Sequence, residues 1–128
     1  LKSNLIVKPY LDIVKNNKYR KTIARFRSSS HALEIERGRH TKPKTPLDKR
    51  LCAKCKTLES EVHFVMYCTV NFEERLEFFE KILNIFSPFG ILSDTEKFKF
   101  IFANNDPRCL SWLGKFLHTS FETRNNCI

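Results

Sequence analysis

Glycine-rich and proline-rich linkers are missing from this sequence of 128 residues, which holds only 3 glycines and 5 prolines. No apolar run approaches the roughly 18 residues that a membrane-spanning helix needs, and the N-terminal residues lack the pattern of a signal peptide. Internal repeats and low-complexity segments are absent as well. From these absences we expect a soluble, intracellular protein of the nucleus or the cytoplasm.

Recognisable catalytic signatures are also absent. The sequence has no glycine-rich phosphate loop, no Ser-x-x-Lys and no paired-aspartate metal motif. The remaining enzyme interpretation is a Cys–His nucleophilic pair, for which the sequence offers no third group to orient the histidine. We therefore expect no enzymatic activity from this chain alone and no small-molecule substrate.

Positive charge, in contrast, is plentiful and uneven. The formal net charge is +9, yet residues 1–56 hold 16 Lys or Arg against 4 Asp or Glu, whereas residues 57–128 hold 7 against 10. An excess of this kind attracts polyanions, most commonly nucleic acid. An anionic membrane is the lesser alternative, because no apolar insertion face joins the basic residues.

Cysteine is present in an odd number, 5, and three of the cysteines stand within 17 residues. Secreted disulfide scaffolds usually hold an even set, so this pattern favours a reducing compartment and metal ligation. Of the other two, Cys109 is predicted to be a small buried apolar residue and Cys127 a thiol at a frayed end.

The three clustered cysteines form a metal-ligand pattern with one histidine: Cys52-x2-Cys55-x7-His63-x4-Cys68. A tetrahedral zinc ion takes thiolate or imidazole ligands at about 2.0–2.3 Å, and each short pair supplies two of them without closing a long loop. Since four ligands leave no position for water, the pattern predicts one structural Zn²⁺. The alternative is four unrelated residues: two loop thiols, a core histidine and a buried cysteine.

The two ligand pairs are expected in different local structures. The first pair fits a tight turn, and the second fits a helix that begins around Ser60. Five residues span about one and a half helical turns, so slight unwinding near Cys68 would direct both side chains to one point. We expect Glu61 to face solvent; the alternative is that it accepts a hydrogen bond from the His63 ring.

Hydrophobic periodicity predicts helices before the cysteines. One is expected over residues 5–15 and a second over residues 18–27, capped by Asn17, with a core-facing stripe of Tyr19, Ile23 and Phe26. Residues 28–40 leave two alternatives open, an extended segment or one helical turn ended by a glycine. Two prolines predict a non-helical connection over residues 41–47.

Three further helices are predicted after the cysteines. The first, over residues 71–86, is expected to face the core with Phe72, Leu76, Phe79, Leu83 and Phe86. The second begins with a capping box at Ser93 and ends near Asn104, although residues 97–100 also permit a strand. The third begins at Asp106-Pro107, and its apolar stripe is Leu110, Leu113, Leu117 and Phe121.

The expected fold is therefore mainly α: a small helical domain with an embedded Cys-Cys-His-Cys zinc motif. We expect a single domain over residues 1–128, made of a basic helix-and-loop arm (1–51), the zinc motif (52–68) and a Phe-rich helical bundle (69–128). A short β-hairpin at the first cysteine pair is left open.

Phosphate contacts are assigned to the basic half of the chain. The candidates are Arg20, Lys21, Arg25, Arg27, Arg37, Arg39, Lys49, Arg50, Lys54 and Lys56. Tyr19 and Phe64 could stack on bases, although core packing is the expected role of both. The alternative function is a zinc-stabilised protein-interaction or scaffolding module that docks through the Phe-rich helices.

Several of these motifs occur together in a known arrangement. The run Ala24-Arg25-Phe26-Arg27-x3-His31-Ala32-Leu33-x-Ile35-Glu36-Arg37-Gly38-Arg39 is followed by Pro46-x3-Arg50-x-Cys52-x2-Cys55 and by Glu61-x-His63-Phe64-x3-Cys68. This arrangement resembles the zinc-binding region after the reverse transcriptase domain in polyproteins of non-long-terminal-repeat retrotransposons. The resemblance covers residues 19–68 well and extends more loosely to Phe121.

The resemblance implies an accessory domain that positions template RNA or target DNA for a polymerase, with an adjacent polymerase domain as a further expected partner. It also implies that Cys52, Cys55, His63 and Cys68 are the zinc ligands. The seven-residue middle gap separates the motif from the retroviral-type knuckle, where the gap is four. Polymerase aspartates and an endonuclease are missing, so no activity carries over. A chain that begins with Leu1 is expected to be a fragment, or an isolated or remnant copy.

Overall fold

A computed structural model describes residues 17–28, 31, 33–104 and 106–127, so the helix expected over residues 5–15 lies outside the described part. The α-helices are α3 (Asn17–Arg27), α4 (Glu34–Arg37), α5 (Phe72–Ile85), α6 (Asp94–Ala103) and α7 (Pro107–Cys127). The connections between them contain short helical turns of other types. Those of the 3-10 type are η1 (Leu47–Lys49), η3 (Thr69–Asn71) and η4 (Ser87–Ile91), and η2 (His63–Tyr67) is π-helical. The mainly α-helical fold is thus confirmed.

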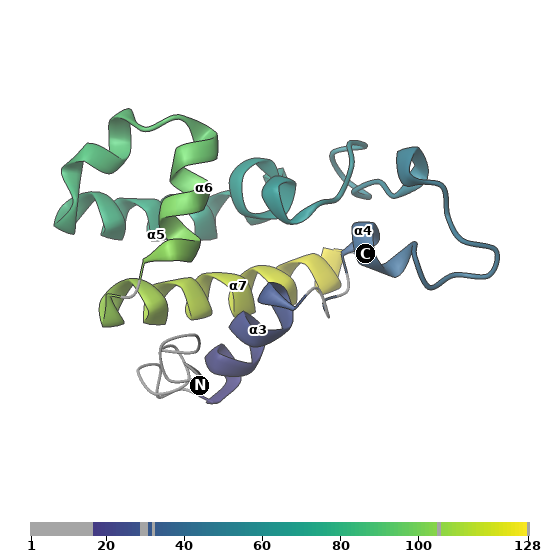
Figure 1. Ribbon diagram of the computed structural model, residues 1–128, viewed down its shortest axis with the longest axis horizontal. Coiled ribbons are helices and arrows are strands. Elements are labelled where there is room, and N and C mark those ends of the chain that lie inside the picture. Colours follow the sequence, from purple (N-terminus) through teal and green to yellow (C-terminus); the bar gives the residue numbers. More distant parts are fainter. Residues whose placement is uncertain (1–16, 29–30, 32, 105, 128) are drawn as a thin grey trace.

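Helix α7 is the longest helix of the described residues, and α3 and α5 both pack against it (Figure 1). It begins as predicted, because the Asp106 carboxylate accepts a hydrogen bond of 2.8 Å from the backbone N–H of Arg108, which satisfies one free amide of the first turn. The predicted apolar stripe is confirmed: Leu110, Leu113 and Leu117 are fully buried.

Helix α3 packs across α7, with Ile23 and Phe26 buried as the predicted stripe requires. Gly114 lies at this crossing. A Cβ at this position would come within 2.6 Å of the Tyr19 Cβ, so the absence of a side chain allows the two helices to approach closely. The basic N-terminal half therefore shares one hydrophobic core with the C-terminal helix.

Helix α5 forms close to its predicted bounds, but the prediction of its inner face is wrong for four of its five residues, and only Phe79 packs against the core. Phe72 and Leu76 are each 55% exposed, and Leu83 and Phe86 are each 38% exposed. The buried face consists instead of Arg75, Phe78 and Ile82. The helix is apolar on two adjacent sides, and the inward side contains a buried arginine that a search for an apolar stripe passes over.

Helix α6 and its flanks follow the sequence closely. The Ser93 hydroxyl accepts from the Glu96 N–H at 3.2 Å, and the Glu96 carboxylate accepts from the Ser93 N–H at 3.0 Å, so the predicted capping box is present. Ile101 is buried and Phe98 and Phe102 pack against the core, and the alternative strand over residues 97–100 is wrong. Pro88 stands in the turn η4 that follows the end of α5.

The segment before the cysteines is mostly irregular. The open question over residues 28–40 is answered by a single helical turn, α4, which ends at Gly38. The non-helical connection predicted over residues 41–47 is confirmed as far as Pro46, because the 3-10 turn η1 begins at Leu47. The short hairpin that the sequence left open at the first cysteine pair is present, within the described residues, only as one antiparallel bridge between Leu51 and Leu58. No helix in the described ranges combines the length and the apolar character that crossing a membrane requires.

Candidate metal centre

The four sequence-predicted ligands come together in the structure. One ligand atom from each of Cys52, Cys55, His63 and Cys68 lies within 4.8 Å of the others. The first two come from the turn that the Leu51–Leu58 bridge closes, and the other two come from the π-helical turn η2 and the residue after it. The cluster is therefore placed to hold a metal ion.

A tight turn positions the first pair, as predicted. The Cys52 N–H donates to the Thr57 carbonyl at 2.8 Å, and the Lys56 N–H donates to the Cys52 carbonyl at 3.0 Å. Lys56 adopts the left-handed backbone conformation, with a φ of 61°. This reversal turns the chain back so that both cysteine sulfurs stay on one side of it.

A widened helical turn positions the second pair. The helix begins at Glu61, and the Cys68 N–H donates to the His63 carbonyl, five residues earlier, at 2.8 Å. A π-helical turn places residues five apart about one turn from each other, so both side chains point to the same side. The predicted unwinding near Cys68 is confirmed as this wide turn.

The His63 ring has the arrangement that a metal ligand needs. Its Nδ1 lies 3.4 Å from the Thr57 hydroxyl, whereas its buried Nε2 has no hydrogen-bond partner among the described residues. A buried polar atom without a partner is costly, and metal-bound histidines commonly use their other nitrogen for an orienting hydrogen bond. The free Nε2 and three sulfurs form a donor set that suits a thiophilic metal ion.

The thiols and the imidazole differ in their protonation. Burial, with a smaller contribution from the nearby Cys52 sulfur, raises the pKa of Cys68 to about 12. Burial opposes ionisation of Cys55, but hydrogen bonds with the side chain and backbone of Thr69 outweigh it and lower the pKa of that thiol. Burial also lowers the pKa of His63, which favours the neutral, ligating imidazole.

An arginine and an asparagine support the second ligand pair through hydrogen bonds to backbone carbonyl groups. The Arg75 guanidinium donates to the Cys68 carbonyl at 2.8 Å and to the Asn71 side-chain oxygen at 3.1 Å, and the Asn71 amide donates to the Phe64 carbonyl at 3.0 Å. Arg75 also places a positive charge beside the thiols. No sequence signal marked either residue, because a polar side chain on an amphipathic helix is ordinarily expected at the surface.

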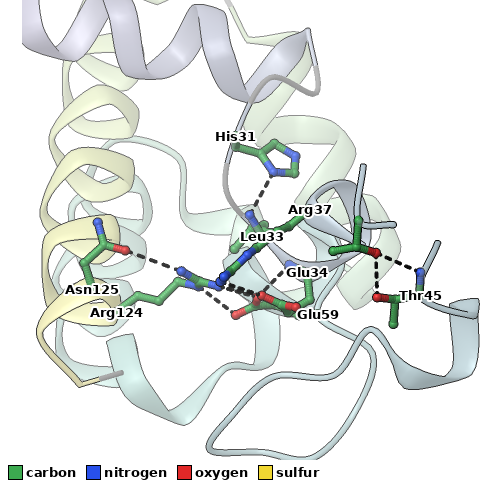
Figure 2. A network of polar contacts seen from close by, with 9 residues as sticks. His31, Leu33, Glu34, Arg37, Thr45, Glu59, Arg124 and Asn125 are labelled. Carbon is green, nitrogen blue, oxygen red and sulfur yellow. Dashed lines mark hydrogen bonds and ion pairs between the residues drawn. The ribbon is translucent and has the colours of Figure 1, made fainter. Parts of the chain in front are cut away.

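A buried ion pair ties the segment between the ligand pairs to α7 (Figure 2). The Arg124 guanidinium donates to the two Glu59 carboxylate oxygens at 2.7 and 2.9 Å, and the Glu34 N–H donates to the same carboxylate at 2.8 Å. These hydrogen bonds to Glu59 raise the pKa of Arg124 despite its burial. Sequence reasoning missed this pair, whose two members are 65 residues apart.

Glu61 matches the expected solvent-facing position only in part, and the alternative contact with the His63 ring is wrong. Its carboxylate lies 2.7 Å from Nε2 of His31, and the Nδ1 of that ring accepts from the Leu33 N–H at 3.3 Å. Glu61 is thus half-buried, with 27% of its side-chain surface exposed, and it contacts the ring of His31 and not that of His63. Its partner lies 30 residues upstream, beyond the reach of a local pattern.

The ten candidate phosphate contacts are mostly exposed. Arg20 and Arg50 are half-buried, and the exposed ones are Lys21, Arg25, Arg27, Arg37, Arg39, Lys49, Lys54 and Lys56. Arg50 has a structural role, because it donates to the carbonyl oxygens of Thr45 and Ile35 at 2.9 and 3.1 Å. It is therefore the weakest member of the set.

The aromatic and cysteine predictions are largely confirmed. Phe64 is buried and stacks on Phe121 with ring centroids 4.5 Å apart, so the alternative that it stacks on bases is wrong. Tyr19 packs against the core, as expected. Cys109 is buried, and the side chain of Cys127 lies outside the described part of the structure.

Comparison with known proteins adds no relative. No protein-family model, no curated protein and no solved structure matches this chain. The resemblance to a retrotransposon domain stays a prediction from the motifs. What the structure shows is a mainly helical chain with a Cys3His cluster that can hold a metal ion.

Proposed function

We propose that this chain is a zinc-stabilised nucleic-acid-binding module, which acts as an accessory part of a retrotransposon reverse transcriptase or is an isolated or remnant copy of such a part. The Cys3His cluster supports the zinc assignment, because sets of three thiolates and one imidazole are typical of structural zinc sites. Cys52, Cys55, His63 and Cys68 would hold the ion, and a bound ion would fix the turn and the π-helical segment relative to each other.

One observation carries the nucleic-acid part of the proposal: exposed cations concentrate on the segments that lead into the metal cluster. Residues 17–56 hold 13 Lys or Arg against 3 Asp or Glu. Lys21 and Arg25 are exposed on α3 away from its buried stripe, and Lys54 and Lys56 are exposed on the turn that carries the first ligand pair. Such cations bind phosphates through release of counterions.

The experiment is a salt titration of binding to labelled RNA and DNA by the zinc-loaded chain. If about five phosphates are neutralised, the logarithm of the affinity falls with the logarithm of the salt concentration with a slope of about −3.5 to −4.5. The triple variant K21Q/R25Q/K54Q should make this slope shallower by two to three units, about one unit per lost contact. An affinity that does not change with salt concentration would contradict the proposed nucleic-acid function.

The matched control is Lys99→Gln, which removes one exposed lysine from α6 in the acidic half of the chain. Its affinity and salt slope should equal those of the unmutated protein. If Lys99→Gln weakens binding as much per charge as the triple variant does, binding follows net charge and not the proposed surface.

The alternative function, a protein-interaction or scaffolding module, is favoured by one observation, the exposed apolar stripe of α5. Self-association at micromolar concentration without any shift of labelled RNA or DNA would decide for it.

A further inference from the structure

Helix α5 and the residue that follows it carry a row of large apolar residues, here called the α5 seam: Phe72, Leu76, Phe79 and Leu83 in the helix and Phe86 at its C-terminal cap. Their spacing alternates four, three, four and three residues, which is the heptad repeat of a helix that packs against another helix. Four of the five are 38–55% exposed, and Phe79 is half-buried. One face of α5 thus packs into the core of the chain, and a second apolar face is left uncovered within the described structure.

Ring contacts with the rest of the chain fix the position of the α5 seam. Phe78, on the inner face, stacks on Phe116 of α7 with ring centroids 5.0 Å apart. Phe79 packs edge-on against Phe89 at 5.3 Å, and Phe86 stacks on Phe100 of α6 at 4.9 Å. A preorganised apolar row loses little conformational entropy on binding, which favours its use as a docking surface.

The open side of the α5 seam is acidic. Glu73, Glu77 and Glu80 are exposed on α5, and Glu73 and Glu80 occupy the heptad position directly beside the apolar row. The opposite side is occupied by the chain's own core residues Arg75 and Ile82. A partner therefore meets glutamates on one side only. Nucleic acid and anionic membranes are repelled there, and a second α5 seam would bring like charges together.

We propose that the α5 seam docks one amphipathic α-helix of another protein, whose apolar heptad stripe is flanked by Lys or Arg. Leucine-type side chains of that helix fit between the exposed rings, and its basic residues pair with Glu73 and Glu80. The proposal rests on α5 alone and does not depend on the metal or on nucleic acid.

The test uses the full chain and three labelled peptides of about three heptads. One peptide has Leu at the seam positions flanked by Lys, the second has the same Leu positions flanked by Glu, and the third is a scrambled version of the first. We expect the Lys peptide to bind at least about tenfold more tightly than the other two, measured by fluorescence anisotropy.

Variants connect the binding to the α5 seam. Leu76→Asp places a charge in the middle of the row at an exposed position and should weaken binding of the Lys peptide by about tenfold or more. Asn84→Asp adds the same charge at an exposed position of α5 off the row, beside the acidic side, and should not weaken binding. The double variant E73K/E80K should reverse the preference in favour of the Glu peptide.

Three results would overturn the proposal. If the Lys and Glu peptides bind equally, the seam does not select its partner by charge. If Leu76→Asp leaves binding unchanged, the peptide binds at another surface. A concentration-dependent dimer that Leu76→Asp abolishes makes a second copy of the chain the occupant.

Discussion

Lys56 follows the first ligand pair in a left-handed backbone conformation, with a φ of 61°, where a side chain with a Cβ is strained. Glycine has no such strain. We expect Lys56→Gly to raise the free energy of unfolding of the metal-bound chain by about 0.5–1 kcal/mol in urea denaturation. The same variant should weaken nucleic-acid binding, because one exposed cation is lost.

Lys54→Gly is the matched control. It removes the same charge from the same turn, but Lys56 is the only non-glycine residue with a positive φ in the described ranges. Lys54→Gly should therefore weaken nucleic-acid binding equally and give no stabilisation. Equal stability of the two variants would mean that the backbone at Lys56 is not strained.

The buried pair of Glu59 and Arg124 gives a second prediction at the scale of the residue. Arg124→Met leaves the Glu59 carboxylate buried without its cation, which should lower the free energy of unfolding by about 3–5 kcal/mol. Glu122→Gln, an exposed change on the same helix, should cost less than about 0.5 kcal/mol. Similar values for both variants would show that the pair contributes no more than a surface ion pair.

Sequence reasoning found the ligands but not the residues that support them. Cys52, Cys55, His63 and Cys68 were predictable because the ligand types and their spacing lie within one short segment. Glu59 was not predictable, because a carboxylate is buried only where a cation meets it, and that cation stands 65 residues later. A polar residue is buried only with a partner, and a partner that is distant in the sequence cannot be found from a local pattern.

At the scale of the element, the crossing of α3 and α7 depends on Gly114. Alanine normally stabilises a helix interior by about 0.5–1 kcal/mol relative to glycine. Here a new Cβ would lie 2.6 Å from the Tyr19 Cβ and would push the helices apart. We expect Gly114→Ala to lower the free energy of unfolding by about 1–3 kcal/mol in urea denaturation.

The control for this crossing is Asn126→Ala, an exposed change in the same helix that should be close to neutral or slightly stabilising. A gain of stability in Gly114→Ala similar to that of a surface alanine would contradict the close approach of the two helices.

The helices show which features of an element the sequence specifies. The starts of α6 and α7 were predictable, because caps such as Ser93 and Asp106 act on the next three residues. The inner face of α5 was not predictable, since apolar residues cover two of its sides and tertiary packing selects between them. The π-helical turn η2 likewise has distant support, because Asn71 donates to the Phe64 carbonyl within it and Arg75 donates to the Cys68 carbonyl directly after it.

For the molecule as a whole, metal binding should depend on pH. Cys68 is a protonated thiol at neutral pH in the metal-free chain, because burial raises its pKa to about 12. Zinc must displace this proton, so acid favours release and alkali favours binding. The logarithm of the apparent zinc affinity should rise by about two to three per pH unit near neutrality, as several thiols lose their protons.

Competition with a chromogenic zinc chelator between about pH 6 and 8 measures this dependence. The lowered pKa of His63 keeps its imidazole neutral over most of this range, so the thiols should account for the slope. An affinity that does not change with pH would mean that the thiols do not ligate the ion.

Charge distribution was the other molecular property that the sequence specified, and it locates the cations on α3 and the segments before the metal cluster. The sequence did not predict that this basic half shares a core with α7, because residues such as Ile23 and Leu117 come together only in the folded chain. A zinc ion at the cluster would thus stabilise a turn and a helix that both lie beside this core.

The most direct test is the metal content of the freshly reduced, purified chain, together with its helicity before and after chelation. We predict one zinc ion per chain, loss of the ion in Cys52→Ser and His63→Ala, and retention in Cys109→Ser, which changes a cysteine outside the cluster. Chelation should unfold much of the helical structure, since structural zinc contributes on the order of 10 kcal/mol. A reduced, unmutated chain that holds no stoichiometric zinc and keeps its helicity in chelator would contradict the proposed zinc centre.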